Sequence, residues 1–351
     1  MSQYWSELVR RLDPYVPGEQ PRAQKLVKLN TNENPYPPSP RVMEAIAAVS
    51  ESQLARYPDP ESKQLREAFA DRAGLSAEEV FVGNGSDEVL GHTFQALLKQ
   101  SLPIRFPDIS YSFYPVWCKL YGIEFETMPL SADFRIDPGA YVGDCGGIIV
   151  PNPNAPTGIG LSLDKVRQLL DGCTESAVVI DEAYVDFGAE SATRLVRDYP
   201  NLLVVQTLSK SHSLAGLRVG AAFGQRPLIE ALERVKNSFN SYPLDAVAQA
   251  AAMAALQDEA YLQSACARVV RNRDLLVDRL GVMGFDVLPS VANFLFVHHP
   301  DHEAATLFKA LRDRGVIVRY FDRPRISGHL RISVGSEEDC KALLEALAEI
   351  V

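Results

Sequence analysis

Short unbroken runs of apolar residues alternate with amphipathic stretches through the middle of the chain. These runs lie at residues 80–82, 147–150, 177–180, 201–205 and 219–223. Helical spacing of apolar residues follows the first run up to about residue 99 and returns at 163–170. Continuous apolar strands are typical of a sheet covered on both faces, and their alternation with helices is typical of parallel pairing. This region is therefore predicted to be an α/β unit with a mostly parallel sheet.

The regions on either side of this unit have a different pattern. Residues up to about 40 are rich in Pro and Asn, which predicts turns and an extended arm. Helices are predicted at 41–50, at 62–73, from about 246 to 280 and near 303–314, and short strands at 285–287, 293–297, 316–319 and 330–334. We expect an N-terminal arm (1–40) that contributes to the small domain and to the active site, a large domain (41–275) and a small C-terminal α+β domain (276–351).

The charge balance narrows the class of partner. Lys and Arg number 35 and Asp and Glu number 45, so the formal net charge is −10. A nucleic acid or an anionic membrane would require a basic face, so neither is expected as a partner. No apolar run approaches the ~20 residues that cross a bilayer, and the first residues, MSQYWSELVRR, lack the pattern of an export signal. We therefore expect a cytoplasmic protein.

The spacing of cysteine and histidine does not indicate a metal site. The five cysteines are scattered and never form a CxxC pair, which is typical of reduced, buried thiols. His298, His299 and His302 cluster in HHPDH, where a loop after a strand is the simpler interpretation. No metal is predicted.

Polar clusters follow several predicted strands, at the edge where open parallel sheets bind ligands. GNGSDE (83–88) lies between a strand and a helix, where the glycines and Ser86 suit a phosphate at the helix start. An ordinary helix cap by Ser86 and Asp87 explains the same residues. Asp181 follows another strand and is interpreted as a helix cap, a metal ligand or the partner of a buried cationic nitrogen.

Lys210 and Arg218 add two cations at the same edge. Partial burial of Lys210 would lower its pKa and make its amine a nucleophile, and a surface Lys is the alternative. Arg218 lies on glycine-containing backbone, which suits a phosphate. An amine, a carboxylate and a phosphate cradle are together what pyridoxal phosphate (PLP) requires of a protein.

These motifs carry a resemblance to a known family. NAPTG (154–158), DEAY (181–184), SK (209–210) and LRVG (217–220) resemble, in this order, the motifs of PLP-dependent fold-type I aminotransferases of class I and II. LNTNENP (29–35), RYPDP (56–60), GNGSDE (83–88) and LRISVG (330–335) are similar to those of histidinol-phosphate aminotransferases. The resemblance implies a mostly parallel seven-stranded sheet flanked by helices, a smaller α+β domain and a homodimer with shared active sites.

The resemblance also implies roles for the cofactor-site residues. Lys210 would bind PLP covalently and move a proton, Asp181 would pair with the pyridine nitrogen, and Tyr184 would contact the ring O3′ oxygen. Tyr111 would stack on the ring, and Tyr57 would reach the phosphate from the neighbouring subunit. The phosphate cradle would consist of Gly85, Ser86, Asp87, Ser209 and Arg218.

On the substrate side the resemblance implies histidinol phosphate and 2-oxoglutarate, which yields glutamate. Arg331 would bind the acceptor carboxylate, and Arg319 would meet the substrate phosphate or the distal carboxylate. Four further residues are expected to line the same pocket: Tyr15, Asn32, Glu33 and Asn293.

Two positions depart from the family pattern, and other activities share the motifs. Ala155 stands where the family has an Asn that contacts O3′, so Asn154 or Tyr184 would make that contact instead. His212 stands where an apolar residue is common. An aromatic amino-acid aminotransferase and a threonine-phosphate decarboxylase-like lyase would keep the same catalytic residues. A non-catalytic regulatory domain is disfavoured, because no basic helix-turn-helix extension is present.

Overall fold

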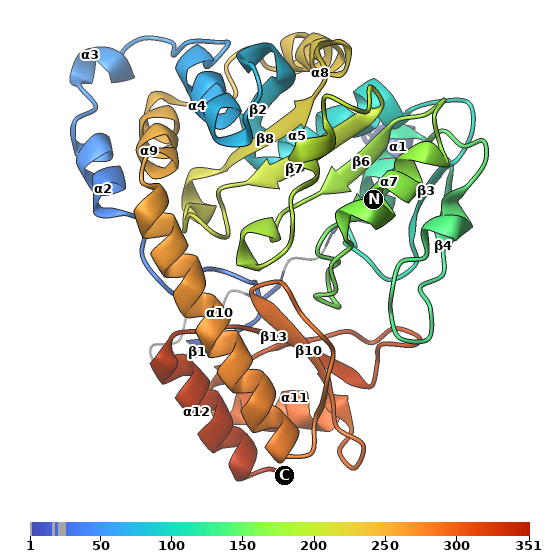
Figure 1. Cartoon of the computed structure of the whole chain (residues 1–351), viewed down its shortest axis with the longest axis vertical. Coiled ribbons are helices and arrows are strands. Elements are labelled where there is room, and N and C mark those ends of the chain that lie inside the picture. Colours follow the sequence, from blue (N-terminus) through green and yellow to red (C-terminus); the bar gives the residue numbers. More distant parts are fainter. Residues whose placement is uncertain (1, 16–17, 20–25) are drawn as a thin grey trace.

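Two β-sheets, of seven and four strands, organise the molecule, and a third sheet has only two strands. The computed structural model describes residues 2–15, 18–19 and 26–351. The larger sheet lies in the upper part of Figure 1 and the smaller one lies below it. The long helix α10 (Glu259–Val282) runs continuously from one part to the other (Figure 1) and passes through the predicted domain limit at 275. The predicted domain limits therefore stay a prediction.

The larger sheet has seven strands and is mostly parallel. Strand β8 is antiparallel to both of its neighbours, and the other pairings are parallel. The predicted fold class, a mostly parallel seven-stranded α/β sheet with a smaller α+β part, is confirmed. In spatial order the strands are β2 (Val80–Asn84), β8 (Val219–Gly224), β7 (Leu202–Thr207), β6 (Val178–Asp181), β5 (Gly147–Pro151), β3 (Ile104–Pro107) and β4 (Phe125–Met128).

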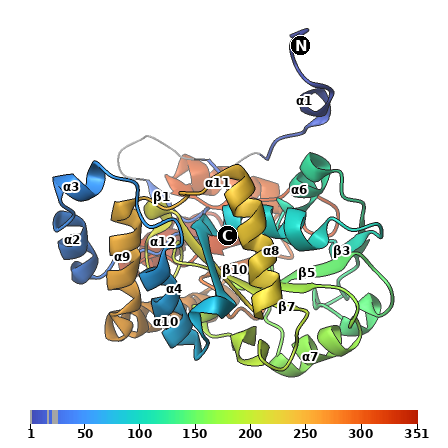
Figure 2. The same ribbon diagram turned by 90° about the horizontal axis from the view of Figure 1, so that it is seen from above.

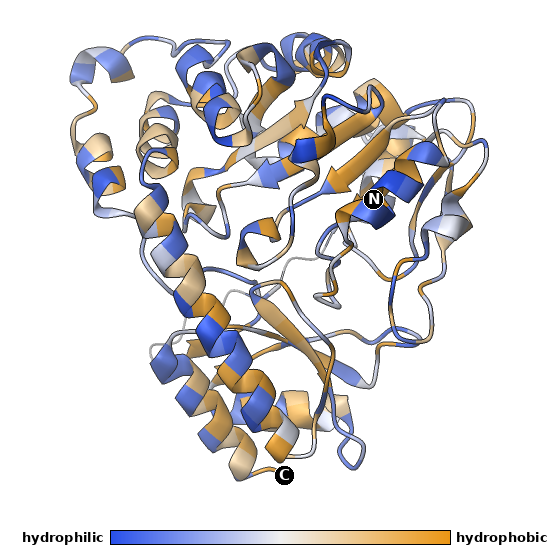
Figure 3. Ribbon diagram, in the orientation of Figure 1, coloured by the Kyte–Doolittle hydropathy of each residue, from blue (hydrophilic) through white to orange (hydrophobic). Residues whose placement is uncertain are grey.

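Both faces of this sheet are buried, which explains the unbroken apolar runs. In β6, Val178 and Ile180 face one hydrophobic core and Val179 faces the other. Consecutive residues of a strand point to opposite faces, so a strand between two cores needs an apolar residue at every position. Figure 3 shows apolar colouring along the central strands and two-sided colouring on the helices. The helices of this part are α2 (Pro40–Ala47), α3 (Glu51–Leu54), α4 (Lys63–Ala73), α5 (Gly85–Thr93), α6 (Tyr114–Tyr121), α7 (Leu163–Asp171), α8 (Arg226–Phe239) and α9 (Ala246–Leu256).

The smaller sheet is antiparallel and is joined by the N-terminal arm. Its strands, in spatial order, are β12 (Arg319–Tyr320), β13 (His329–Ser333), β10 (Phe294–His298) and β9 (Asp286–Val287), and α11 (Ala304–Asp313) and α12 (Glu337–Ala348) accompany it. Strand β1 of the arm (Val27–Lys28) pairs in parallel with β11 (Val316–Ile317). The Ser333 amide donates to the Leu29 carbonyl at 2.9 Å, so the arm continues along the smaller sheet.

Two local features differ from the simple pattern. The helical stretch predicted from about 246 to 280 is broken between α9 and α10, where the Asp258 side chain caps α10 by accepting from the Tyr261 amide. Helix α1 (Glu7–Arg11) buries none of its residues and projects from the rest of the molecule (Figure 2). Among the described helices, none is both long and apolar enough to cross a bilayer.

Candidate active site

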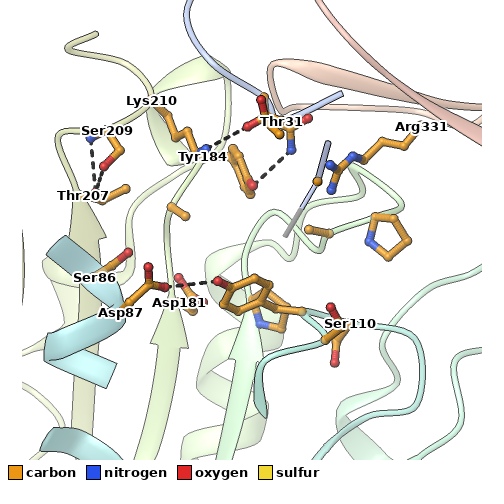
Figure 4. Close-up of a pocket in the computed structure, with 18 of the residues that line it drawn as sticks. Thr31, Ser86, Asp87, Ser110, Asp181, Tyr184, Thr207, Ser209, Lys210 and Arg331 are labelled. Atoms are coloured by element: carbon orange, nitrogen blue, oxygen red, sulfur yellow. Dashed lines mark hydrogen bonds between the residues drawn. The ribbon is translucent and has the colours of Figure 1, made fainter. Parts of the chain in front are cut away.

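A cavity of about 270 Å³ lies where the larger sheet, the smaller sheet and the arm meet. Parallel strands β6 and β7 end at this cavity with Asp181 and Thr207, as expected for the carboxyl edge of an open α/β sheet. Figure 4 shows side chains from all three regions pointing toward the same space. Twelve of the predicted site residues line it: Tyr15, Asn32, Ser86, Asp87, Tyr111, Asp181, Tyr184, Ser209, Lys210, Arg218, Arg319 and Arg331.

Lys210 presents a desolvated amine to the cavity. It follows Ser209 in the loop after β7, and its Nζ donates to the Thr31 carbonyl of the arm at 3.0 Å (Figure 4). Burial, together with the nearby positive charge of Arg331, lowers the pKa of Lys210 to about 8. A larger fraction of the amine is therefore neutral near pH 8 than for an ordinary Lys, and a neutral amine is a nucleophile.

Asp181 supplies a buried carboxylate, and one of its two oxygens has no hydrogen-bond partner among the described residues. Its Oδ2 accepts from the Tyr114 hydroxyl at 2.8 Å, and its buried Oδ1 has no hydrogen-bond partner among the described residues. Burial raises the pKa of Asp181 to about 6. An unpaired buried carboxylate oxygen is costly, so this geometry fits a ligand that brings a cationic N–H to it. It is not the helix cap considered from the sequence.

The start of α5 offers backbone amide groups to an anion. The residue before the helix, Asn84, makes no side-chain cap, and Gly85 has a left-handed φ of 79°. A Cβ added at Gly220 would lie 2.4 Å from the Ser86 amide nitrogen, so the glycine there allows β8 to approach the helix start closely. Free amide groups at a helix start attract anions, in agreement with the predicted phosphate site.

Arg218 and Ser209 complete the cradle. The guanidinium of Arg218 donates to Asp87 Oδ2 at 2.9 Å and to Ser209 Oγ at 3.4 Å. Asp87 Oδ1 also accepts from the Tyr111 hydroxyl at 3.1 Å. A Cβ at Gly85 would lie 2.6 Å from Arg218 Nη2, so a larger residue there would displace the guanidinium. The residues predicted to bind a phosphate thus gather around one cation, Arg218, and the start of one helix, α5.

Arg319 and Arg331 form the opposite wall. They are direct partners in the antiparallel pairing of β12 with β13. Arg331 donates to the Asn30 carbonyl at 2.9 Å, its Nε is buried without a partner, and burial lowers its pKa. Within the described part of the chain neither guanidinium forms an ion pair. Like charges directly opposite each other are unfavourable in a sheet, so the pair fits an anionic ligand.

Residues of the arm tie the two walls together. Asn32 Nδ2 donates to the Tyr184 hydroxyl at 3.1 Å, and the Asn32 carbonyl accepts from Asn293 Nδ2 at 2.9 Å. Asn293 is fully buried and does not line the cavity. Glu33 does not line it either, because its carboxylate accepts from Lys28 and Thr31.

Three predicted cofactor residues do not line the cavity: Gly85, Tyr57 and Asn154. Tyr57 is 82% exposed and stacks on Tyr242 at a ring distance of 4.6 Å. Asn154 is buried, and its amide donates to the Ile109 carbonyl at 3.0 Å and to Thr157 at 3.1 Å. Ala155, the position of the usual family Asn, does line the cavity. The roles predicted for Tyr57 and Asn154 stay predictions.

Several functional groups were not predicted from the sequence. Tyr114 holds Asp181, the Thr31 carbonyl accepts from Lys210, and Thr207 bonds to Ser209 at 2.9 Å. Phe321 lines the cavity beside the arginines. Only Thr207 carried a signal, because it lies between the predicted strand 201–205 and Lys210. The residues present fit PLP: an amine, a lone carboxylate oxygen and an anion cradle face one space.

Comparison with known proteins agrees with this site. The family model for aminotransferase class I and II matches residues 24–347. Histidinol-phosphate aminotransferase 2 of Dechloromonas aromatica (strain RCB) is 59% identical over 354 residues, covering 100% of this chain and 99% of that protein. Histidinol-phosphate aminotransferase 1 of Bradyrhizobium diazoefficiens is 58% identical over 351 residues, covering 100% of both.

A solved structure gives the same result for the fold. The crystal structure of histidinol-phosphate aminotransferase from Sinorhizobium meliloti in complex with pyridoxal-5′-phosphate has a TM-score of 0.88 to this chain. The two share 23% identity over 100% of this chain and 99% of that one, a likeness that shows the fold. From the sequence matches, the chain belongs to the class I and II aminotransferases and, within them, to the histidinol-phosphate aminotransferases.

Proposed function

We propose that the protein transfers the amino group of L-histidinol phosphate to 2-oxoglutarate, giving imidazole acetol phosphate and L-glutamate, with PLP as cofactor. This reaction would place it in histidine biosynthesis. One observation carries the proposal: the Lys210 amine shares a cavity with an Asp181 oxygen and, on the opposite wall, with two arginines, and within the described residues that oxygen has no hydrogen-bond partner and the arginines form no ion pair. The full-length relatives at 58–59% identity, named histidinol-phosphate aminotransferases, support the choice of substrate.

The cofactor side of the cavity suits the chemistry of amino transfer. PLP, when bound, supplies an electron sink for the bond broken at the substrate α-carbon. Asp181 would accept the pyridinium N–H, and Tyr184 would donate to the ring oxygen. Lys210 would hold the cofactor and, once released by the substrate amine, would move a proton at the α-carbon as a positioned base. Its lowered pKa supports this role.

The substrate side suits two different anions in turn. Arg331 would pair with a carboxylate of 2-oxoglutarate, and Arg319 would pair with its other carboxylate or with the phosphate of histidinol phosphate. A guanidinium binds both groups through two parallel hydrogen bonds, so one pair of arginines serves both half-reactions. A ping-pong sequence follows, because the two substrates would occupy the same wall.

A homodimer with shared active sites is the second part of the proposal. Tyr57 does not line the cavity of its own chain, and other large apolar side chains are exposed in this part of the molecule, among them Met43, Leu54 and Phe239. Exposed apolar surface of this kind favours a protein partner. Tyr57 would then reach the phosphate cradle of a second copy. We place the enzyme in the cytoplasm, a proposal that the five free cysteines support.

A substrate screen tests the reaction. Purified protein with PLP and 2-oxoglutarate is offered L-histidinol phosphate, L-phenylalanine or L-threonine phosphate, and glutamate formation is measured. We expect histidinol phosphate to be the best donor. A clear preference for phenylalanine, or decarboxylation of threonine phosphate, would show that the substrate is wrong although the family stands.

Mixed dimers test the shared site. A Tyr57→Ala variant and a Lys210→Ala variant, each poorly active alone, are unfolded and refolded together. If Tyr57 serves the neighbouring subunit, the mixture contains dimers with one intact site and regains activity. No gain over the separate variants would contradict sharing.

A further inference from the structure

The loop between β12 and β13 reaches from the smaller sheet to the larger part of the molecule through one arginine. Arg325 donates from Nη1 to Asp108 Oδ2 at 2.9 Å and from Nη2 to the carbonyls of Leu130 and Ser131, both at 2.8 Å. Its guanidinium also lies 5.6 Å from the ring centre of Phe134. A single exposed ion pair contributes little to stability, but a guanidinium with three acceptors in a fixed arrangement is held much more firmly.

Asp108 is fixed in turn by the loop that follows β4. Its Oδ1 accepts from the Leu130 amide at 2.9 Å, and its own amide donates to the Met128 carbonyl at 2.9 Å. Asp108 directly follows β3 and precedes Ser110, which lines the active-site cavity. The acceptor for Arg325 therefore belongs to the same segment that forms one wall of the cavity.

The residues around Arg325 show that this contact is built into the fold. Arg325 has a left-handed φ of 68°, which is uncommon for a residue other than glycine and persists where the surroundings determine it. The next residue, Ile326, is 4% exposed and belongs to the hydrophobic core of the larger part. The loop is thus attached at two consecutive residues, by an apolar side chain and by a charged one.

The same loop begins with the cavity residues. Phe321 lines the active site, and Arg319 precedes it by two positions in β12. A second cavity of about 220 Å³ adjoins the active site, and Phe321 and Ser110 line both, so the loop at Phe321 is not closely packed on every side. Nothing else in the described loop donates a side-chain hydrogen bond to the larger part.

We propose that Arg325 is a positioning residue. Its hydrogen bonds to Asp108, Leu130 and Ser131, here called the clasp, would hold the β12–β13 loop in place and thereby keep Phe321 and Arg319 against the substrate. The inference rests on the proposed function for its substrate. Loss of the clasp lets the arginine wall shift away, which weakens substrate binding, whereas the cofactor side, on the other sheet, keeps its geometry. The clasp therefore acts on binding far more than on the proton transfer at Lys210.

The test uses single-turnover reaction of the PLP-loaded enzyme with L-histidinol phosphate, which separates the half-saturating concentration from the maximal rate. Arg325→Ala and Asp108→Asn should each raise the half-saturating concentration about tenfold and keep the maximal rate within about threefold. Arg325→Lys should recover part of the loss, because it keeps the charge but not the three-bond fork. Arg323→Ala is the matched control, since that side chain makes no hydrogen bond among the described residues.

Hydrogen exchange of the cofactor-free protein gives a second readout that needs no activity. The clasp predicts faster exchange of amides in 321–329 in Arg325→Ala and Asp108→Asn than in Arg323→Ala, and a double variant that exchanges no faster than Arg325→Ala alone. Unchanged exchange, or additive effects of the two substitutions, would overturn the clasp. If Arg325→Ala does not fold, Asp108→Asn and Arg325→Lys carry the test. Failure of the unaltered enzyme to use histidinol phosphate would overturn the proposed function, and exchange would still decide on the clasp.

Discussion

The two walls of the active site are built in different ways. On the cofactor side, Asp181 ends the buried strand β6, and Ser209 and Lys210 lie in the loop after the buried strand β7 of the same sheet. On the substrate side, Arg319 and Arg331 come from a separate sheet and are completed by the arm, whose Asn30 carbonyl accepts from Arg331. A wall made by one rigid sheet sets the reaction geometry, and a wall made of three separate segments sets how firmly the substrate is held.

The two walls also differ in the kind of charged group that they carry. Burial moves Lys210 and Asp181 toward their neutral forms, so the cofactor side has groups that exchange protons near neutral pH. The substrate side has two guanidinium groups, which stay charged and only bind. Substitutions on the first wall should therefore affect chemistry, and substitutions on the second should affect binding.

Removal of the amine should have the largest effect. Lys210→Ala loses both the covalent attachment point and the base, so transamination should fall by at least about 10⁴-fold. Glutamate formation is measured with each purified variant. Lys341→Ala, at an exposed position on α12, is the control and should keep full activity. Substantial transamination by the Lys210→Ala protein would contradict the assignment of the chemistry to this wall.

Removal of the buried arginine should come next. Arg331→Ala should lower kcat/KM for 2-oxoglutarate by about 10²–10³-fold, because a desolvated guanidinium–carboxylate contact is lost. The reaction rate of the enzyme with saturating histidinol phosphate should change much less. Arg314→Ala, which removes an ion pair to Glu349 at 3.1 Å, is the control. An unchanged half-reaction with 2-oxoglutarate would refute the role of Arg331.

The buried carboxylate should be visible in stability. Because the folded-state pKa of Asp181 is raised from 3.8 to about 6, the folded state binds the extra proton between these values, and the stability contributed at low pH is lost as the pH rises through about 6. Relative to Asp181→Asn, the cofactor-free protein should therefore lose roughly 2 kcal/mol of unfolding free energy between pH 4 and pH 7. Urea unfolding at several pH values measures this. A difference that does not vary with pH would contradict an unpaired buried carboxylate.

Arg319 should show the smallest effect. It is only partly buried, so solvent replaces part of what the guanidinium provides. Arg319→Gln should raise KM for both substrates about tenfold and leave kcat nearly unchanged. Steady-state kinetics with each substrate varied in turn provide the values. A fall in kcat with constant KM would move Arg319 from the binding wall to the chemical one.

Much of the larger sheet could be predicted from the sequence, because strands buried on both faces are apolar at every position. The strands at one edge of the sheet, β3 and β4, could not be predicted in this way. Strand β4 is largely exposed, and β3 ends in Pro107, so neither has an unbroken apolar run. The break between α9 and α10 also escaped prediction, because Asp258 caps a helix without a Gly or Pro to mark the end of the previous one.

The same contrast holds for the site. Lys210, Asp181 and Arg218 could be proposed from their residue types and their positions after strands. The Thr31 carbonyl could not, because a backbone acceptor has no residue-type signal. Tyr114 depends on how α6 packs against β6, and the direct pairing of Arg319 with Arg331 depends on strand register. Both depend on tertiary structure, which the residue pattern alone does not specify. Only the resemblance to a family pointed to the arginines in advance.

The proposed chemistry requires that the amine of Lys210 carries the cofactor. Borohydride reduction of the PLP-loaded protein, followed by proteolysis and mass spectrometry, identifies the labelled lysine. We expect a phosphopyridoxyl group on the peptide that contains Lys210 and on no other peptide in comparable yield. An unmodified Lys210, with the label elsewhere or absent, would contradict it.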